Sequence, residues 1–267
     1  MRLGLIGYGT IAQTLLDTMQ ATGTRADALI VLVRAGTEAR VPAGHPAADA
    51  VHVVTDAAGL LAHAPDLVVE CAGHGAVSAH VPPLLEAGTD VVVVSVGALA
   101  DAALHDRLTG AATRGGARLI LPPGAVGGVD ILAALGLGGD LAVTYRGTKP
   151  PRAWAGTPAE DVCDLGALTG PATIFTGTAR EAATAYPKNA NVAATLALAG
   201  AGFEATRVEL VADPAAPGNL HAFEAVSPLG RVTVSIENTP SGNARTSMTT
   251  IYSVLRAIRT HAGPTVI

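Results

Sequence analysis

Six residues near the start of the chain, Gly7-Tyr8-Gly9-Thr10-Ile11-Ala12, have the types and spacing that hold a dinucleotide. They read G-x-G-x-x-A, directly after a strand-length apolar run and at the start of a helical pattern, which is the context that makes this short motif informative. Gly7 permits the tight turn, Gly9 has no Cβ to block a pyrophosphate, and Ala12 lets the helix pack closely on the strand. The free N–H groups of the helix then bind the phosphates. The motif predicts NAD or NADP as cofactor; the alternative is a glycine turn without a ligand.

The residue that ends the second strand normally distinguishes the two cofactors. An Asp or Glu there accepts a hydrogen bond from the ribose 2′-hydroxyl of NAD. In this chain the apolar run Leu29–Val33 ends at Arg34. A guanidinium accepts no hydrogen bond but binds a phosphate well, so Arg34 favours NADP, or the use of both cofactors. The alternative is a solvated arginine that contacts nothing.

Strand-length apolar runs alternate with helical patterns through the first half of the chain. The runs are Leu3–Ile6, Ala28–Val33, Val51–Val54, Leu67–Glu70, Val91–Ser95 and Arg118–Leu121. Near-continuous apolar runs are typical of strands that are covered on both faces in a parallel sheet, and their crossovers are right-handed by default. These observations predict an α/β fold with a doubly wound Rossmann sheet. Within it, Pro82-Pro83 should interrupt the helix expected over 76–87.

A second, α+β catalytic domain is predicted after residue 124. The runs Asn219–Val226 and Arg231–Glu237 flank a turn-forming Ser-Pro-Leu-Gly segment, which indicates a hairpin in an antiparallel or mixed sheet. A final helical pattern begins at Met248 and should, by analogy with other two-domain folds, return to the first domain. We therefore expect a dinucleotide-binding domain over residues 1–124 and 243–267. Residues 125–242 are expected to form the substrate, catalytic and dimerisation domain.

Composition and charge exclude several classes of protein. The 267 residues are 49% hydrophobic and 15% charged, which excludes disorder over most of the chain. The net charge of −5 and the lack of a basic run argue against a nucleic-acid partner, and apolar stretches fall short of the ~20 residues that span a membrane. The two cysteines suggest neither a disulfide framework nor a metal site. With no signal-peptide pattern, we expect a cytoplasmic protein.

Two of the eight histidines could serve a reaction of a small substrate. His74 follows the fourth predicted strand, at the edge of the sheet where ligands of open sheets bind, so contact with substrate or ribose is expected. His221 lies on a predicted strand of the second domain and could exchange protons near neutral pH. On pattern alone, the alternative that each is a structural histidine stays open.

Cations in the second domain could bind carboxylates. Lys188 stands at the start of a predicted helix that begins near Asn189, where free N–H groups also favour an anion. Lys188 could act as an acid/base of lowered pKa or as a carboxylate anchor; for Asn189 and Asn191 the alternative is helix capping. A further basic cluster of Arg146, Lys149 and Arg152 is a weaker candidate, for which a solvated charged loop is the favoured interpretation.

Several segments, spread over the length of the chain, together resemble the L-aspartate dehydrogenase family. The segments are Gly4–Ala12, Val69–His74, Val93–Leu99, Gly124–Asp130, Tyr186–Thr195, Ala212–Pro214 and Asn219–His221. The first is generic to dinucleotide-binding folds, whereas the Gly-Ala-Val-Gly-Gly, Pro-Lys-Asn-Ala-Asn-Val-Ala-Ala-Thr and Asn-Leu-His segments are specific to that family.

The resemblance implies NAD(P)-dependent oxidative deamination of L-aspartate to iminoaspartate, which gives oxaloacetate and ammonia, or the reverse reaction, with a role in NAD biosynthesis. It places the catalytic histidine at His221 and cofactor contacts at Ala125 and Asn191. Lys188 is the rival acid/base and the expected substrate anchor, with Asn189 and His74. A homodimer is the expectation from the family. The alternatives are a dehydrogenase of another small amino acid or semialdehyde, and a non-enzymatic NAD(P) sensor.

Overall fold

The computed structural model describes residues 1–187, 189–238 and 247–264. The chain divides into two compact units, which we call unit 1 (Met1–Pro122 with Ile251–Ile267) and unit 2 (Pro123–Thr250). Lys188 and the predicted domain boundary at 242/243 lie outside the described residues. In the described part of the chain, no helix has the length and apolar character needed to cross a membrane.

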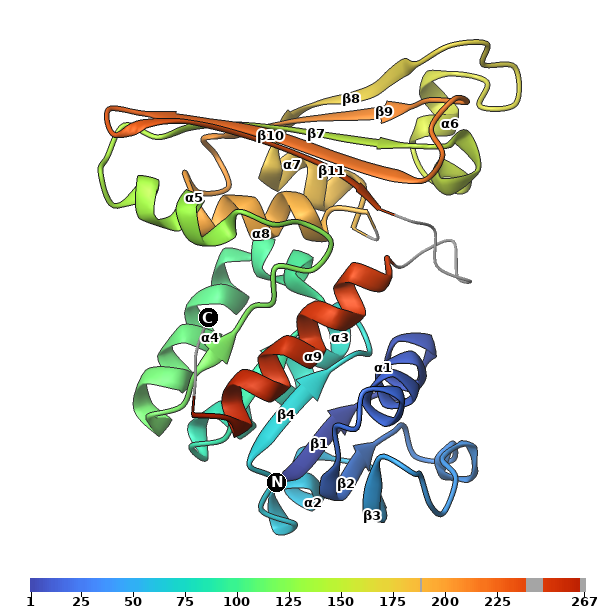
Figure 1. The fold of residues 1–267 in the computed structure, drawn as a ribbon, viewed down its shortest axis with the longest axis vertical. Helices are drawn as coiled ribbons and strands as arrows, with labels where there is room; N and C mark the ends of the chain where they lie inside the picture. Colours follow the sequence, from blue (N-terminus) through green and yellow to red (C-terminus); the bar gives the residue numbers. More distant parts are fainter. Residues whose placement is uncertain (188, 239–246, 265–267) are drawn as a thin grey trace. The chain divides into compact units, whose positions relative to one another are not determined.

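Unit 1 is built on a six-stranded parallel sheet in the order β3-β2-β1-β4-β5-β6 (Figure 1). Its strands are β1 (Arg2–Ile6), β2 (Ala26–Leu32), β3 (Ala48–Val54), β4 (Leu67–Glu70), β5 (Asp90–Val93) and β6 (Leu119–Ile120). Its helices are α1 (Thr10–Ala21), η1 (Glu38–Arg40), α2 (Ala57–Ala62), α3 (His74–Glu86), η2 (Val96–Ala100) and α4 (Ala102–Gly115). The chain order reverses between β1 and β4, since β1 pairs with β2 on one side and β4 on the other. The predicted doubly wound sheet is confirmed.

The prediction that Pro82-Pro83 interrupts a helix is wrong, because α3 continues through both prolines. Pro82 has no N–H for the carbonyl oxygen of Ser78, one turn earlier. Arg107 of α4 supplies the missing donor: its guanidinium donates to that carbonyl oxygen and to the Ser78 hydroxyl. A neighbouring helix thus satisfies the group that the proline leaves unpaired.

The last helix, α9 (Met248–Ala262), continues into unit 1 from Ile251 onwards. The Arg259 guanidinium donates to the carbonyl oxygen of Thr22 and to the hydroxyl of Thr24, just after α1. Nearer the end of α9, His261 lies 3.5 Å from the carboxylate of Asp90. The C-terminal helix therefore completes the parallel-sheet unit.

Unit 2 is built on a mixed five-stranded sheet in the order β11-β10-β7-β9-β8. Its strands are β7 (Ala142–Lys149), β8 (Ala172–Thr178), β9 (Thr206–Ala212), β10 (Asn219–Ser227) and β11 (Gly230–Asn238). Its helices are α5 (Val129–Gly136), η3 (Pro151–Trp154), α6 (Ala159–Val162), α7 (Ala179–Ala185) and α8 (Asn191–Ala199). Figure 1 shows α5, α7 and α8 together on one face of this sheet. The prediction of a second α+β fold with a hairpin of β10 and β11 is confirmed.

Candidate active site

A cleft of about 570 Å³ lies in unit 1 at the carboxyl ends of β1, β2 and β4. This is the point where the strand order reverses, and open α/β sheets bind their ligands at such a point. The cleft is lined by Ile6–Gly9, Leu32–Arg34, Thr37, Arg40, Cys71–Ala76 and His80. Of the predicted site residues, the structure brings together Gly7, Gly9, Arg34 and His74 here.

The glycine-rich turn has the shape that a dinucleotide phosphate requires. Gly7 has φ +92°, and a Cβ on it would lie 2.8 Å from the Cβ of Ala72, so this glycine is needed for the fold. A Cβ on Gly9 would meet no atom within 4 Å and would project into open space. Thr10 and Ile11 form the first turn of α1, while Ala12 is fully buried and serves packing. The residues present therefore fit a pyrophosphate at the N-terminus of α1.

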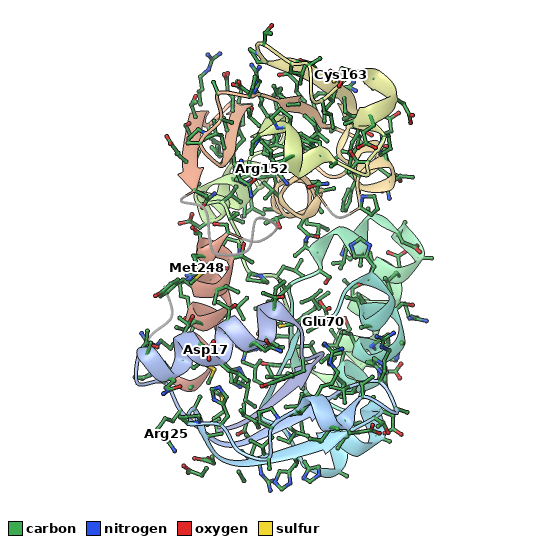
Figure 2. All side chains as sticks on the ribbon, turned by 90° about the vertical axis from the view of Figure 1, so that its right-hand side faces the viewer. Asp17, Arg25, Glu70, Arg152, Cys163 and Met248 are labelled. Carbon is green, nitrogen blue, oxygen red and sulfur yellow. The ribbon has the colours of Figure 1, made fainter. Side chains whose placement is uncertain are left out.

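A buried carboxylate that the sequence analysis missed shapes the same cleft. Glu70 ends β4 with no exposed surface, in the interior of unit 1 (Figure 2). Its Oε1 accepts from the backbone N–H groups of Ala72 and Gly73, at 2.7 Å each, and Ser95 donates to the carboxylate through both N–H and hydroxyl, at 3.0 Å. Glu70 thus fixes the loop after β4 that lines the cleft. The sequence feature that could have identified it is a glutamate at the end of an otherwise apolar strand.

Two arginines lie at the β2 side of the cleft. Arg34 follows β2, and Arg40, which the sequence analysis missed, ends η1. The turn between them is held by Thr37, whose N–H and hydroxyl donate to the Arg34 carbonyl oxygen at 3.0 and 2.7 Å. Glu38 does not line the cleft. The two guanidiniums can bind an anion here.

His74 is the first residue of α3 and lines the cleft from the β4 side. Burial lowers its pKa below the usual value, against the opposing effect of the Glu70 charge. A neutral imidazole at neutral pH suits a hydrogen bond to a hydroxyl of ribose or substrate.

Unit 2 holds a second cluster, around His221 on β10. His221 pairs with Gly147 across the strands, and its Nδ1 lies 2.8 Å from the hydroxyl of Tyr145, two residues along β7. A Cβ on Gly147 would lie 2.5 Å from that hydroxyl oxygen, so the glycine makes room for the contact. Burial, and next the charge of Lys149, lower the pKa of His221 to about 4. At neutral pH the imidazole is neutral and can accept a proton.

Lys149 lies on the same face of β7 as Tyr145 and Gly147, since alternate residues of a strand share a face. Its Nζ donates to Oδ1 of Asn189 at 2.8 Å and lies 5.2 Å from the centre of the Trp154 ring. Burial lowers the pKa of Lys149 to about 8. The sequence favoured a solvated loop for Arg146, Lys149 and Arg152. This prediction is wrong for Lys149, which is partly buried at the end of β7. Its neighbour Arg146 pairs with Glu209 at 3.5 Å, and Arg152 is exposed in η3.

In the segment before α8, Asn189 binds the side chain of Lys149 and does not cap the helix. The helix begins at Asn191, after Ala190, with no capping side chain. Asn189 instead accepts the hydrogen bond from Lys149, so the capping alternative does not apply to it. Asn191 is the first residue of α8.

Ala125 lies in unit 2, and its backbone is anchored by a buried asparagine. Asn238, at the end of β11, donates from Nδ2 to the Ala125 carbonyl oxygen at 3.1 Å. Its Oδ1 accepts from the hydroxyls of Ser247 and Thr249, at 2.9 and 2.7 Å. Asn238 was missed by the sequence analysis because its partners are distant in the chain. Over the described residues, no group of three His, Cys, Asp or Glu side chains could hold a metal ion.

Comparisons with known proteins match both units. The model of the aspartate dehydrogenase C-terminal domain matches residues 130–261, and that of the homoserine dehydrogenase NAD-binding domain matches residues 7–122. L-aspartate dehydrogenases from Ruegeria pomeroyi and Ralstonia pickettii are 48% and 46% identical, over 97% and 98% of this chain and 92% and 98% of theirs. A crystal structure of aspartate dehydrogenase from Thermotoga maritima has 26% identity and a TM-score of 0.77, over 100% of this chain and 99% of that one.

The open space beside Gly9 provides a test of cofactor binding. Gly9→Val should lower the affinity for NADPH by more than about tenfold, because the added side chain takes the place of the phosphate, and should leave the melting temperature unchanged. Gly7→Ala should lower the melting temperature, because of its positive φ and the contact with Ala72. Fluorescence titration measures the affinity for NADPH and thermal unfolding measures the melting temperature. Gly110→Ala on α4 is the control variant. An affinity within twofold of wild type for Gly9→Val would contradict this placement of the phosphate.

Proposed function

Because the chain belongs to the L-aspartate dehydrogenase family, we propose that it catalyses the reversible NAD(P)-dependent oxidative deamination of L-aspartate. The amine carbon loses a hydride to the cofactor, and the resulting iminoaspartate takes up water to give oxaloacetate and ammonia. The observation that carries the proposal is the buried His221, with its hydrogen bond to Tyr145 and with Lys149 further along the neighbouring strand.

The cofactor is held by unit 1. The turn at Gly7 and Gly9 and the first turn of α1 receive the pyrophosphate, and His74 is placed for the ribose or the substrate. When bound, the nicotinamide supplies or accepts the hydride. From unit 2, we assign cofactor contacts to Ala125 and Asn191, on the resemblance of their segments to the family.

His221 is the proposed acid/base. Its Nδ1 is engaged by the Tyr145 hydroxyl, so the proton that it exchanges with the substrate amine or with attacking water passes through Nε2. The hydrogen bond also fixes the ring orientation, as second partners of catalytic histidines do. Lys188 stays a candidate carboxylate anchor, with Asn189 beside it in sequence.

Removing the imidazole should separate catalysis from cofactor binding. His221→Ala should lower kcat by a factor of about 10² to 10⁴, the usual contribution of a general acid/base, with NADPH affinity unchanged. The assay follows absorbance of the reduced cofactor with oxaloacetate and ammonia. His105→Ala, on an outer position of α4, serves as control and should retain full activity.

Three outcomes would count against the proposal. Consumption of reduced cofactor that does not need ammonia would exclude the reaction. Turnover that is unchanged in His221→Ala would remove this histidine as acid/base. Tight cofactor binding by the wild-type protein, with no turnover of aspartate or oxaloacetate, would favour the sensor or another substrate.

We assign the adenosine 2′-phosphate of NADP to Arg34 and Arg40, with Thr37 holding the turn between them. No acidic side chain follows β2 at the position that would select NAD, and both guanidiniums line the cleft. The double variant Arg34→Ala/Arg40→Ala should lower NADPH affinity by about 100-fold, since hydrogen bonds to charged groups contribute about 1.5–3 kcal/mol each. NADH affinity should stay within about threefold of wild type, because NADH lacks the phosphate. Equal losses for both cofactors would show that the arginines do not discriminate between them.

We propose a homodimer that forms through the face of the unit 2 sheet opposite α5, α7 and α8. This face carries partly buried residues of β10, such as Leu220, Ala222 and Glu224, and β10 pairs antiparallel with both of its neighbours, β7 and β11. Sedimentation should give twice the mass of 26.6 kDa. Ala222→Arg, which adds a bulky charge opposite Arg146, should shift the protein to monomer with its melting curve still cooperative. A wild-type monomer would refute the proposal.

We also propose that the enzyme is cytoplasmic and that its imine product is used in the synthesis of pyridine nucleotides. The free thiols of Cys71 and Cys163 are compatible with a reducing compartment. The resemblance to the family is the support for the metabolic role.

A further inference from the structure

We propose that the Lys149 ammonium binds the side-chain carboxylate of the substrate and so makes the enzyme selective for dicarboxylates. This rests on the proposed function, which does not itself say which cation receives the acid groups of aspartate. Three observations support this role: the position of Lys149 on β7, the neutral groups that contact its ammonium, and the lack of an ion pair with any carboxylate of the described residues.

The register of the sheet sets Lys149 beside the acid/base. His221 pairs with Gly147, and Lys149 is two residues further along β7 on the same face. Diagonal neighbours of this kind in an antiparallel pair lie about 7–8 Å apart, within reach of long side chains. Tyr145 is the diagonal neighbour on the other side and already reaches the imidazole. With the side-chain carboxylate of aspartate on Lys149, the amine carbon would therefore come within reach of His221.

The ammonium is held in place by neutral groups. Asn189 accepts one of its three hydrogens, and the ring of Trp154 lies against the charge. Trp154 is itself fixed: it has no exposed surface, and its indole N–H donates to the carbonyl oxygen of Val211 at 3.1 Å. These contacts orient the cation without neutralising it.

No carboxylate of the described residues forms an ion pair with Lys149. Burying an unpaired charge is costly, and proteins normally pair such a group. Among the described residues, two of the three ammonium hydrogens have no acceptor, so they and the positive charge are left for a ligand, which by this chemistry is an anion with oxygen acceptors. The side-chain carboxylate of aspartate meets that requirement, and L-alanine and L-asparagine have no such group.

Two substitutions test the role from different sides of the same hydrogen bond. Lys149→Met removes the charge and keeps most of the side-chain volume. Asn189→Asp is isosteric, keeps the acceptor oxygen and adds a negative charge 2.8 Å from Nζ. Each should raise KM for L-aspartate by about 100-fold, as expected when a charged hydrogen bond to the substrate is lost or satisfied internally. Each should also reduce the preference for L-aspartate over L-alanine or L-asparagine.

Asn189→Asp separates this role from a structural one. If Lys149 served only stability, the new ion pair would maintain or raise the melting temperature and leave KM unchanged. We expect a maintained melting temperature together with the raised KM. Arg152→Met removes an exposed cation three residues further along the chain and should leave KM within about twofold of wild type.

The outcomes distinguish this inference from the proposed function. A wild-type enzyme that oxidises L-aspartate, with Lys149→Met and Asn189→Asp of unchanged KM and unchanged substrate preference, would overturn the role of Lys149 alone. A wild-type enzyme without activity on L-aspartate would overturn the proposed function. Inhibition by malonate gives a second measure: its inhibition constant should rise in both variants, whereas NADPH affinity, which belongs to unit 1, should not change.

Discussion

The proposed acid/base site depends on one hydrogen bond, between the Tyr145 hydroxyl and Nδ1 of His221, and that bond depends on Gly147. Residues 145, 147 and 149 share a face of β7, and His221 stands opposite the middle one. Any side chain at 147 would occupy the path of the tyrosine hydroxyl. With glycine there, the Tyr145 hydroxyl contacts the imidazole of His221 from one side, and Lys149 is its diagonal neighbour on the other side. Because alternate residues of β7 share a face, Tyr145 and Lys149 flank the position opposite His221, so the proposed proton carrier lies between an orienting phenol and the proposed anion-binding cation.

The cofactor cleft is organised by a different constraint, namely that buried polar groups need partners. The loop after β4 leaves N–H groups at Ala72 and Gly73, and the carboxylate of Glu70 accepts from both while also binding Ser95 after β5. One buried residue therefore ties together the ends of two neighbouring strands at the edge where the ligand binds. The cleft is lined here mainly by alanine and glycine, which have little or no side chain and so allow the close approach of a flat cofactor.

The elements and the glycine-rich turn could be predicted because their signals are local. Apolar runs and the G-x-G-x-x-A spacing need no knowledge of distant residues, and the parallel sheet and hairpin follow from them. The continuous α3 could not be predicted, because the donor that replaces the Pro82 N–H comes from Arg107 on another helix. Lys149 was misjudged for a related reason: three cations within seven residues resemble a solvated loop until the strand period separates Lys149 from Arg146. The place of Arg40 at the cleft depends on the turn after β2, and the partners of Asn238 depend on where β11 ends, so neither could be read from local sequence.

The charges around His221 also couple substrate binding to proton transfer. Burial, and then the Lys149 charge, keep the pKa of the imidazole at about 4, so the ring is a weak base before the substrate arrives. A carboxylate bound to Lys149 would offset the positive charge, which is the smaller of the two causes, and would so raise the pKa of His221 while the effect of burial remains. With the proposed role of Lys149, the base is therefore stronger when the side-chain carboxylate of the substrate is bound. It follows that a neutral analogue of aspartate is disfavoured twice, first by weaker binding at Lys149 and then by a less basic His221, which makes selectivity in kcat/KM greater than selectivity in binding.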